Sequence, residues 1–180
     1  ILRLESDYSI RLRRAPMVAD ACAHVLGASV SATRIISLRA LQGWIGAYEW
    51  RKKGVFIPAL GQAIYPHYGV FSPVRGEYVD LVAQAPLPTV CQTAFDIGTG
   101  TGVLAAVLAQ RRITKITATD QDPRALACAQ ENLQYLGLSA QVQLQAADLF
   151  PDGRADLIVC NPPWLPAKAT TPIEYAIYDP

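Results

Sequence analysis

The segment Asp96-Ile-Gly-Thr-Gly-Thr-Gly102 constrains the fold of this chain more than any other feature. It follows the apolar run 93–97, and its alternate glycines are typical of a tight turn that leaves a parallel strand and lets a ligand approach the backbone closely. A dinucleotide-binding turn requires its third glycine three places after the second, where this chain has Val103, and a P-loop requires a lysine that this turn lacks. The spacing therefore disfavours both phosphate-binding alternatives.

Asp96 lies two places before the first glycine of this turn. A carboxylate at this position can hold a cationic amine. We therefore expect a ligand with an amino acid part rather than a pyrophosphate.

A second motif, Asn161-Pro-Pro-Trp164, follows the apolar run 156–160. A continuous apolar run predicts a parallel strand that is covered on both faces, and ligands bind beyond the carboxyl ends of such strands. Because proline has no N–H, the corner offers mainly acceptors, the Asn161 side-chain oxygen and the Pro162 carbonyl. Two acceptors suit a target with an NH₂ group, on which Trp164 can stack. Taken alone, Asn-Pro-Pro is more often a rigid turn.

Together, the two motifs resemble those of class I S-adenosylmethionine-dependent methyltransferases, over about residues 65–180. Within that class the chain resembles the release-factor glutamine methyltransferases. The resemblance implies an α/β, Rossmann-like fold in which helices sandwich a parallel sheet. It also implies S-adenosyl-L-methionine as cofactor and methyl transfer to a planar amide or amine nitrogen. The family usually has Tyr where this chain has Trp164, which keeps the plane and lacks the hydroxyl.

The resemblance assigns roles to residues that follow four successive strands. Asp120 ends the predicted strand 115–119, eighteen residues after Gly102, at the distance where an acidic residue meets ribose hydroxyls in such folds; a cap or turn role is the alternative. Asp148 and Leu149 follow the predicted strand 142–146 and are expected beside the adenine. The complete expected cofactor set is Asp96, Gly98, Thr99, Gly100, Gly102, Asp120, Asp148, Leu149 and Asn161. The expected catalytic residues are Asn161, Pro162, Pro163 and Trp164.

Asp122, close to the ribose candidate, is predicted to have a structural role. Asp122-Pro123 supplies an N-cap and a first-turn proline for a helix that Gly137 closes. One apolar face of this helix is formed by Leu126, Ala129, Leu133 and Leu136.

The prolines in the segment 84–89 predict a joint between two domains. Residues 1–84 are expected to form a smaller region of helices, broken near Gly27 and Gly43, and a hairpin with Pro58 and Gly61 in its turn. Residues 90–180 are expected to form the methyltransferase domain. The segment 70–77 loosely resembles the one that glutamine methyltransferases place over the cofactor, with Pro73 and Glu77 as the recognisable points; a plain loop between a strand and a helix is the alternative.

Charge is divided unevenly along the chain. Residues 1–90 hold ten Lys and Arg against six Asp and Glu, and residues 91–180 hold six against nine. The N-terminal region could therefore face an RNA or an acidic protein, although a solvated basic face is the simpler interpretation. A sequence pI of about 7.8 without a long basic stripe favours a protein substrate, such as a translation factor, over RNA or DNA. A non-catalytic, methyltransferase-like binding subunit is a further alternative.

Composition sets further bounds. The longest apolar run, 102–109, is too short to span a bilayer, and the first residues do not resemble a signal peptide, so we expect a cytoplasmic protein without a membrane partner. The four cysteines lie in apolar segments without C-x-x-C spacing, which predicts buried thiols and no metal site. They are Cys22, Cys91, Cys128 and Cys160.

The methyltransferase domain is expected to be incomplete at its C-terminus. Class I methyltransferases have seven strands, and only sixteen residues follow Trp164. A fourth strand without a neighbour would leave an unpaired apolar edge. We therefore expect this chain to be part of a longer protein.

Overall fold

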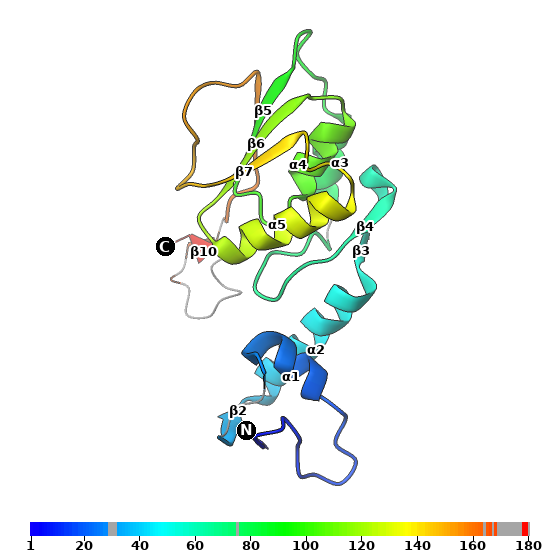
Figure 1. Ribbon diagram of the computed structural model, residues 1–180, viewed down its shortest axis with the longest axis vertical. Helices are drawn as coiled ribbons and strands as arrows, with labels where there is room; N and C mark the ends of the chain where they lie inside the picture. The colour runs from blue at the N-terminus through cyan, green and yellow to red at the C-terminus, as the bar shows by residue number, and fades with distance from the viewer. Residues whose placement is uncertain (29–31, 75, 164, 167, 169–177, 180) are drawn as a thin grey trace. The chain divides into compact units, whose positions relative to one another are not determined.

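The chain divides into two compact units, Ile1–Lys53 and Gly54–Pro180 (Figure 1). The computed structural model describes residues 1–28, 32–74, 76–163, 165–166, 168 and 178–179. The two units are described separately below.

The first unit packs two helices and a short antiparallel strand pair. Strands β1 (Leu2–Leu4) and β2 (Arg34–Ile36) pair, and helix α1 (Ala19–Leu26) packs on helix α2 (Leu38–Lys53). Gly27 follows the last residue of α1, as predicted, whereas the predicted break at Gly43 is wrong because this residue lies inside α2. A helical glycine costs only about 1 kcal/mol relative to Ala, which burial of Leu41 and Trp44 on the same helix can offset.

The second unit is built on a four-stranded parallel sheet with the strand order β7-β6-β5-β8. The strands are β5 (Thr93–Ile97), β6 (Lys115–Asp120), β7 (Val142–Ala146) and β8 (Leu157–Cys160). The order changes direction at β5, as in doubly wound α/β sheets, whose ligands bind at that switch point. The α/β, Rossmann-like prediction is confirmed.

Helices α3 (Glu77–Gln84), α4 (Val103–Gln110) and α5 (Pro123–Tyr135) accompany this sheet (Figure 1). The apolar helix α4 is buried along seven of its eight residues. Its side chains share one core with those on a single face of the sheet, among them Ala94, Ile116, Ala118 and Val142. This packing fixes the start of α4, and with it the glycine-rich turn.

A hairpin precedes α3 and belongs to the second unit. Strands β3 (Val55–Ile57) and β4 (Gln62–Ile64) pair around a 3₁₀ turn, η1 (Pro58–Leu60), with Gly61 in the left-handed conformation, as predicted. Ile57, Leu60 and Ile64 are buried in the same core as α4. The division between the compact units therefore lies at residue 53, before the joint predicted at 84–89, because the apolar side chains of the hairpin complete the core of the sheet domain.

Strand β8 differs from the prediction of a strand covered on both faces. It lies at the edge of the sheet, and Ile158 is 50% exposed. The thiols of Cys22 and Cys128 are buried as predicted, but Cys160, at the end of this edge strand, is exposed and Cys91 is half-buried. A two-residue parallel pair, β9 (Leu165–Pro166) with β10 (Tyr178–Asp179), forms a separate small sheet.

Candidate functional site

The predicted site residues leave the sheet along one edge. Ile97 of β5 is the register partner of Cys160 on one side and of Thr119 on the other. The next residues along the chain, Asn161 and Asp120, therefore start at the same edge as Gly98. Sequence spacing had placed them on separate strands, and the parallel register brings them together at the switch point between β5 and β8.

The turn between β5 and α4 requires its glycines for two reasons. Gly98, Gly100 and Gly102 all have positive φ, at 69°, 55° and 80°. A Cβ at Gly102 would lie 3.1 Å from the Ala129 Cβ on α5, so this glycine also permits close packing of two helices. A Cβ at Gly98, by contrast, would meet no atom of the described residues within 4 Å. The first part of the turn therefore faces open space, where a ligand can approach the backbone.

Asp96 lies beneath this turn and is only 1% exposed. Its Oδ2 accepts hydrogen bonds from the Thr99 hydroxyl at 2.6 Å and from the Ala105 N–H at 3.0 Å. Burial raises the pKa of Asp96 to about 6, although the bonds from Thr99 and Ala105 lower it. Its Oδ1 is buried and has no hydrogen-bond partner among the residues that the structure describes. A buried acceptor without a partner is costly unless a donor reaches it.

Asp120, at the end of β6, is tied to the glycine turn. Its Oδ2 accepts a hydrogen bond from the Gly100 N–H at 3.0 Å, and its Oδ1 accepts one from the Asp122 N–H at 2.9 Å. A carboxylate offers about four acceptor sites, so both oxygens retain capacity for further donors. Asp122 caps α5 by accepting from the Arg124 N–H, as predicted.

The loop after β7 is fastened to β6 by a contact that sequence analysis missed. The buried Thr119 hydroxyl donates to the Leu149 carbonyl at 2.7 Å, and the Ala147 N–H donates to the Asp120 carbonyl at 3.2 Å. Leu149 has a positive φ of 68°, which is strained for a non-glycine residue, and its side chain is 59% exposed. Asp148 is exposed as well. The loop thus presents both residues beside the glycine turn.

The Asn-Pro-Pro corner follows β8. Asn161 and Pro163 are half-buried and Pro162 is exposed. Trp164, the fourth residue of the predicted catalytic motif, lies outside the described residues.

Tyr78 of α3 lies near this edge, and sequence analysis did not identify it. Burial, and secondarily the nearby Asp96 carboxylate, raise the pKa of the Tyr78 phenol. The Phe71 ring lies 6.4 Å from the Tyr78 ring. Tyr78 therefore lies near the buried carboxylate, and Phe71 lies beside Tyr78.

Three further observations concern the described residues. A cavity of about 360 Å³ lies between β3 and the start of α3. Pro73 and Glu77, the recognisable points of the segment expected over the cofactor, line it together with Phe56 and Pro58, whereas none of the residues expected to bind the cofactor or to act in catalysis does. Within the described ranges, no three His, Cys, Asp or Glu side chains are grouped so that they could hold a metal ion. No helix in those ranges has the length and apolar character needed to cross a membrane.

The chain is similar to curated methyltransferases. It is 44% identical over 78 residues to a tRNA1(Val) (adenine(37)-N6)-methyltransferase of Vibrio vulnificus, covering 41% of this chain and 33% of that protein. It is 39% identical over 120 residues to a release factor glutamine methyltransferase of Mycolicibacterium smegmatis, covering 62% of this chain and 42% of that protein. The chain thus spans between a third and about two fifths of the length of these relatives.

A solved structure and a family match complete the comparison. The METTL16 methyltransferase domain superposes with a TM-score of 0.52 at 17% identity, over 73% of this chain and 62% of that one, which shows a shared fold. Residues 62–176 match the family described as methyltransferase small domain. This match confirms the family predicted from the two motifs and supports the predicted cofactor class, S-adenosyl-L-methionine. The chain belongs to the methyltransferase small domain family.

Proposed function

We propose that this protein transfers a methyl group from S-adenosyl-L-methionine to the side-chain amide nitrogen of a glutamine in a protein substrate. The observation that carries the proposal is the register of β5 and β8, which starts the glycine turn and the Asn161-Pro162 corner at neighbouring positions of one sheet edge. A cofactor on the turn would lie beside an acceptor-rich corner.

The residues of the edge fit this cofactor. The buried Asp96 Oδ1 is an acceptor for the ammonium group of its amino acid part, and Thr99 holds that carboxylate in place. The remaining acceptor capacity of Asp120 suits the ribose hydroxyls. Asp148 and the backbone of Leu149, on the loop fastened by Thr119, are proposed to bind the adenine. Gly98, Gly100 and Gly102 shape a backbone that the cofactor can approach closely.

The proposed chemistry needs orientation more than proton transfer. The bound cofactor supplies an electrophilic methyl group on a sulfonium. An amide nitrogen has its lone pair delocalised, and the Asn161 side-chain oxygen and the Pro162 carbonyl would bind its two hydrogens so that the lone pair faces the methyl group. Such alignment can contribute on the order of 7–11 kcal/mol. As the bond between nitrogen and the methyl carbon forms, the bond between that carbon and sulfur breaks. The alkylated nitrogen is acidic, so its proton can leave to water.

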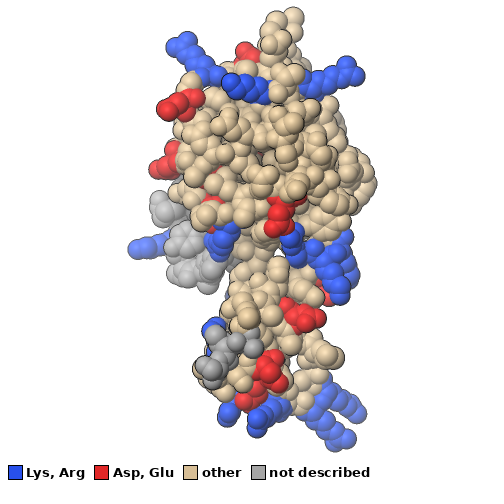
Figure 2. Space-filling view, viewed as in Figure 1, with Lys and Arg blue, Asp and Glu red and all other residues tan. Residues whose placement is uncertain are grey.

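Charge and similarity favour a protein substrate. The longer of the two matches to curated relatives reported above, 120 residues, is to a glutamine methyltransferase. Figure 2 shows the Lys and Arg side chains of the viewed face in separate small groups with Asp and Glu among them, rather than in one basic stripe of the coloured residues.

The charge of the two units differs in sign. Residues 1–53 carry a net charge of +5 against −4 for residues 54–180. We propose that the first unit takes part in substrate docking.

Methylation of an exocyclic amine in RNA is the second candidate. It is favoured by the 44% identity to an enzyme named for adenine N6 methylation. The same acceptors would bind an adenine amino group. A non-catalytic binding subunit is less well supported because this chain retains both the glycine turn and Asn161.

One labelling experiment distinguishes these candidates. The protein is incubated with S-adenosylmethionine labelled in its methyl group and with cell extract, and the labelled fraction is treated with protease or nuclease. The proposal predicts label that only protease releases, in N-methylglutamine after digestion. Nuclease-sensitive label would establish the RNA candidate, and absence of label despite cofactor binding would support the binding subunit. Gln143→Ala, at an exposed position in the middle of β7, is the control that should label normally.

A further inference from the structure

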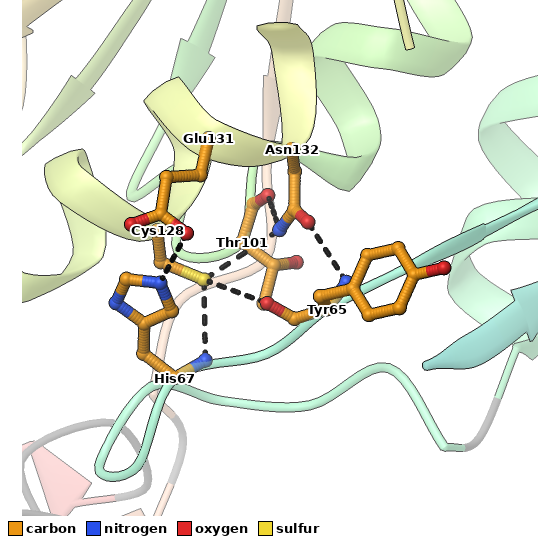
Figure 3. Close-up of polar contacts among 6 residues, drawn as sticks. All are labelled: Tyr65, His67, Thr101, Cys128, Glu131 and Asn132. Atoms are coloured by element: carbon orange, nitrogen blue, oxygen red, sulfur yellow. Dashed lines mark hydrogen bonds and ion pairs between the residues drawn. The ribbon is translucent and has the colours of Figure 1, made fainter. Parts of the chain in front are cut away.

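Asn132 of α5 joins two segments that are far apart in the sequence (Figure 3). It is 2% exposed. Its Oδ1 accepts a hydrogen bond from the Tyr65 N–H at 2.8 Å, and its Nδ2 donates to the Thr101 carbonyl at 3.0 Å. One side-chain amide thus connects the chain after the hairpin to the glycine turn.

Cys128, one helical turn before Asn132, fastens the same segment. The Cys128 Sγ accepts from the His67 N–H at 3.3 Å and lies 3.7 Å from the Tyr65 carbonyl, to which the thiol donates. Pro66 has no N–H to satisfy. Side chains of α5 therefore supply hydrogen-bond partners to the backbone of residues 65 and 67, as a neighbouring strand would. The Asn132 Nδ2 also lies 3.5 Å from the Cys128 Sγ.

The direction of this segment leads toward the cofactor edge. Helix α5 begins at Pro123, just after Asp120, so its first turn lies at the carboxyl edge of the sheet. The chain passes Asn132 at Tyr65 and packs Val70 against Ala125 and Cys128, in the first half of the helix. It therefore runs antiparallel to α5 and arrives at the edge where the glycine turn lies.

The C-terminal end of the segment also lies near the glycine turn. Phe71 packs on Tyr78, and Tyr78 lies near Asp96, beneath the turn. The segment 65–71 is thus connected to the glycine turn through Asn132 and Thr101, and Phe71 at its end contacts Tyr78, which lies near the Asp96 carboxylate.

We propose that Asn132 is a positioning residue that couples the glycine turn to the segment 65–71, so that binding of cofactor at the turn also orders this segment along the site. The inference rests on the cofactor part of the proposed function and is independent of the methyl acceptor. Asn132 acts through Thr101 and Tyr65 and does not itself touch the cofactor.

The test measures binding of S-adenosylhomocysteine and amide hydrogen exchange of residues 65–71. In the wild type, the ligand should slow exchange of the Tyr65 and His67 amides. Asn132→Leu, of similar size and without polar atoms, should weaken binding by roughly 5- to 30-fold, as for one or two lost hydrogen bonds, and abolish this ligand-dependent slowing. Cys128→Ala should weaken binding in the wild-type background and have little further effect in the Asn132→Leu background, because coupled sites are not additive. Cys128→Ser should restore binding.

Leu133→Val is the matched control. Leu133 is buried on the same helix, in the core of the sheet, so the substitution should lower Tm without changing affinity. The proposal is overturned if Asn132→Leu and Cys128→Ala lower Tm like Leu133→Val and bind the ligand as the wild type does. Should Asn132→Leu fail to fold, the Cys128→Ala and Cys128→Ser pair decides by the same criterion. A wild type that does not bind the ligand overturns both the coupling and the cofactor assignment, whereas binding without methylation leaves the coupling intact.

Discussion

The Asp120 Oδ2 accepts a hydrogen bond from the Gly100 N–H at 3.0 Å, and this bond connects the end of β6 to the glycine turn after β5. The other carboxylate oxygen accepts from the Asp122 N–H. Asp120 thus shapes the turn and remains able to accept from a ligand, whereas Asp122, two residues later, caps a helix. These neighbouring carboxylates offer a matched pair for mutation.

Asp120→Ala should weaken binding of S-adenosylhomocysteine by roughly 1.5–3 kcal/mol, the range for a hydrogen bond to a charged group. Asp122→Ala should instead lower stability by about 0.5–2 kcal/mol through loss of the N-cap, with little change in affinity. Calorimetry and thermal unfolding measure the two effects. Wild-type affinity in Asp120→Ala would remove this residue from the ribose role.

Asp96 should make stability fall as pH rises from about 4 to 6. Its pKa in the folded protein is about 6 against a usual 3.8, so the native state binds more protons than the unfolded state in this interval. Above pH 6 the free energy of unfolding is lowered by on the order of 3 kcal/mol, at 1.4 kcal/mol per unit by which the pKa is raised. Asp96→Asn should remove this slope in urea unfolding measured between pH 4 and 7. Parallel stability curves for the two proteins would show that the carboxyl is not perturbed.

The same carboxyl should make cofactor affinity depend on pH. An ammonium group is held by the ionised form, so affinity should fall by up to about tenfold per pH unit below 6. The Asp96→Asn variant should bind the cofactor more weakly than the wild type, and its affinity should not change with pH in this range. An unchanged wild-type affinity between pH 5 and 7 would place the cofactor amine elsewhere.

Local patterns in the sequence were sufficient to predict the sheet and its turns. The apolar run 93–97 and the alternating segment 142–146 form strands as predicted, and Asp122-Pro123 begins a helix, because each signal lies within a few residues. The adjacency of Gly98 and Asn161 could be inferred only through the family resemblance. It depends on which strands are neighbours, and that is a property of the whole sheet.

Contacts between distant segments could not be predicted in this way. Asn132 contacts Tyr65 across 67 residues, and a polar residue on an amphipathic helix is ordinarily expected to face solvent. Thr119 and Leu149 meet across 30 residues for a similar reason. Cys160 was expected to be buried because its strand is apolar, and its exposure follows from the position of β8 at the edge of the sheet.

The exposed edge should make the chain of residues 1–180 self-associate. None of the described strands pairs with the outer side of β8, and Ile158 on this strand is 50% exposed. Ile158→Lys should reduce association in sedimentation velocity, since charge opposes edge-to-edge pairing. Leu81→Lys, at an exposed position on α3, is the control and should leave self-association unchanged. A wild type that stays monomeric at high concentration would contradict this.

Trp164 should contribute to substrate binding more than to the chemical step. Stacking acts in ground and transition states alike, so Trp164→Ala should raise KM by roughly 2- to 10-fold, the equivalent of an aromatic contact, and lower kcat less. Trp164→Tyr and Trp164→Phe keep the plane and should be mild. Steady-state kinetics with the substrate identified by labelling provide the measurement. A large loss of kcat in Trp164→Phe would assign the indole N–H a role in catalysis.

The central claim is that Asn161 binds the target nitrogen while the methyl group moves, and Asn161→Ala tests it most directly. Affinity for S-adenosylhomocysteine should stay within about twofold of wild type, because the other members of the expected cofactor set remain and the Asn161 amide is proposed to bind mainly the nitrogen that accepts the methyl group. The kcat should fall by roughly 10²–10³, the loss that follows removal of one stabilising polar group from a reacting centre. Calorimetry and single-turnover methylation together give both values. Full methylation activity in Asn161→Ala would show that Asn-Pro-Pro is only a turn and would contradict the proposed mechanism.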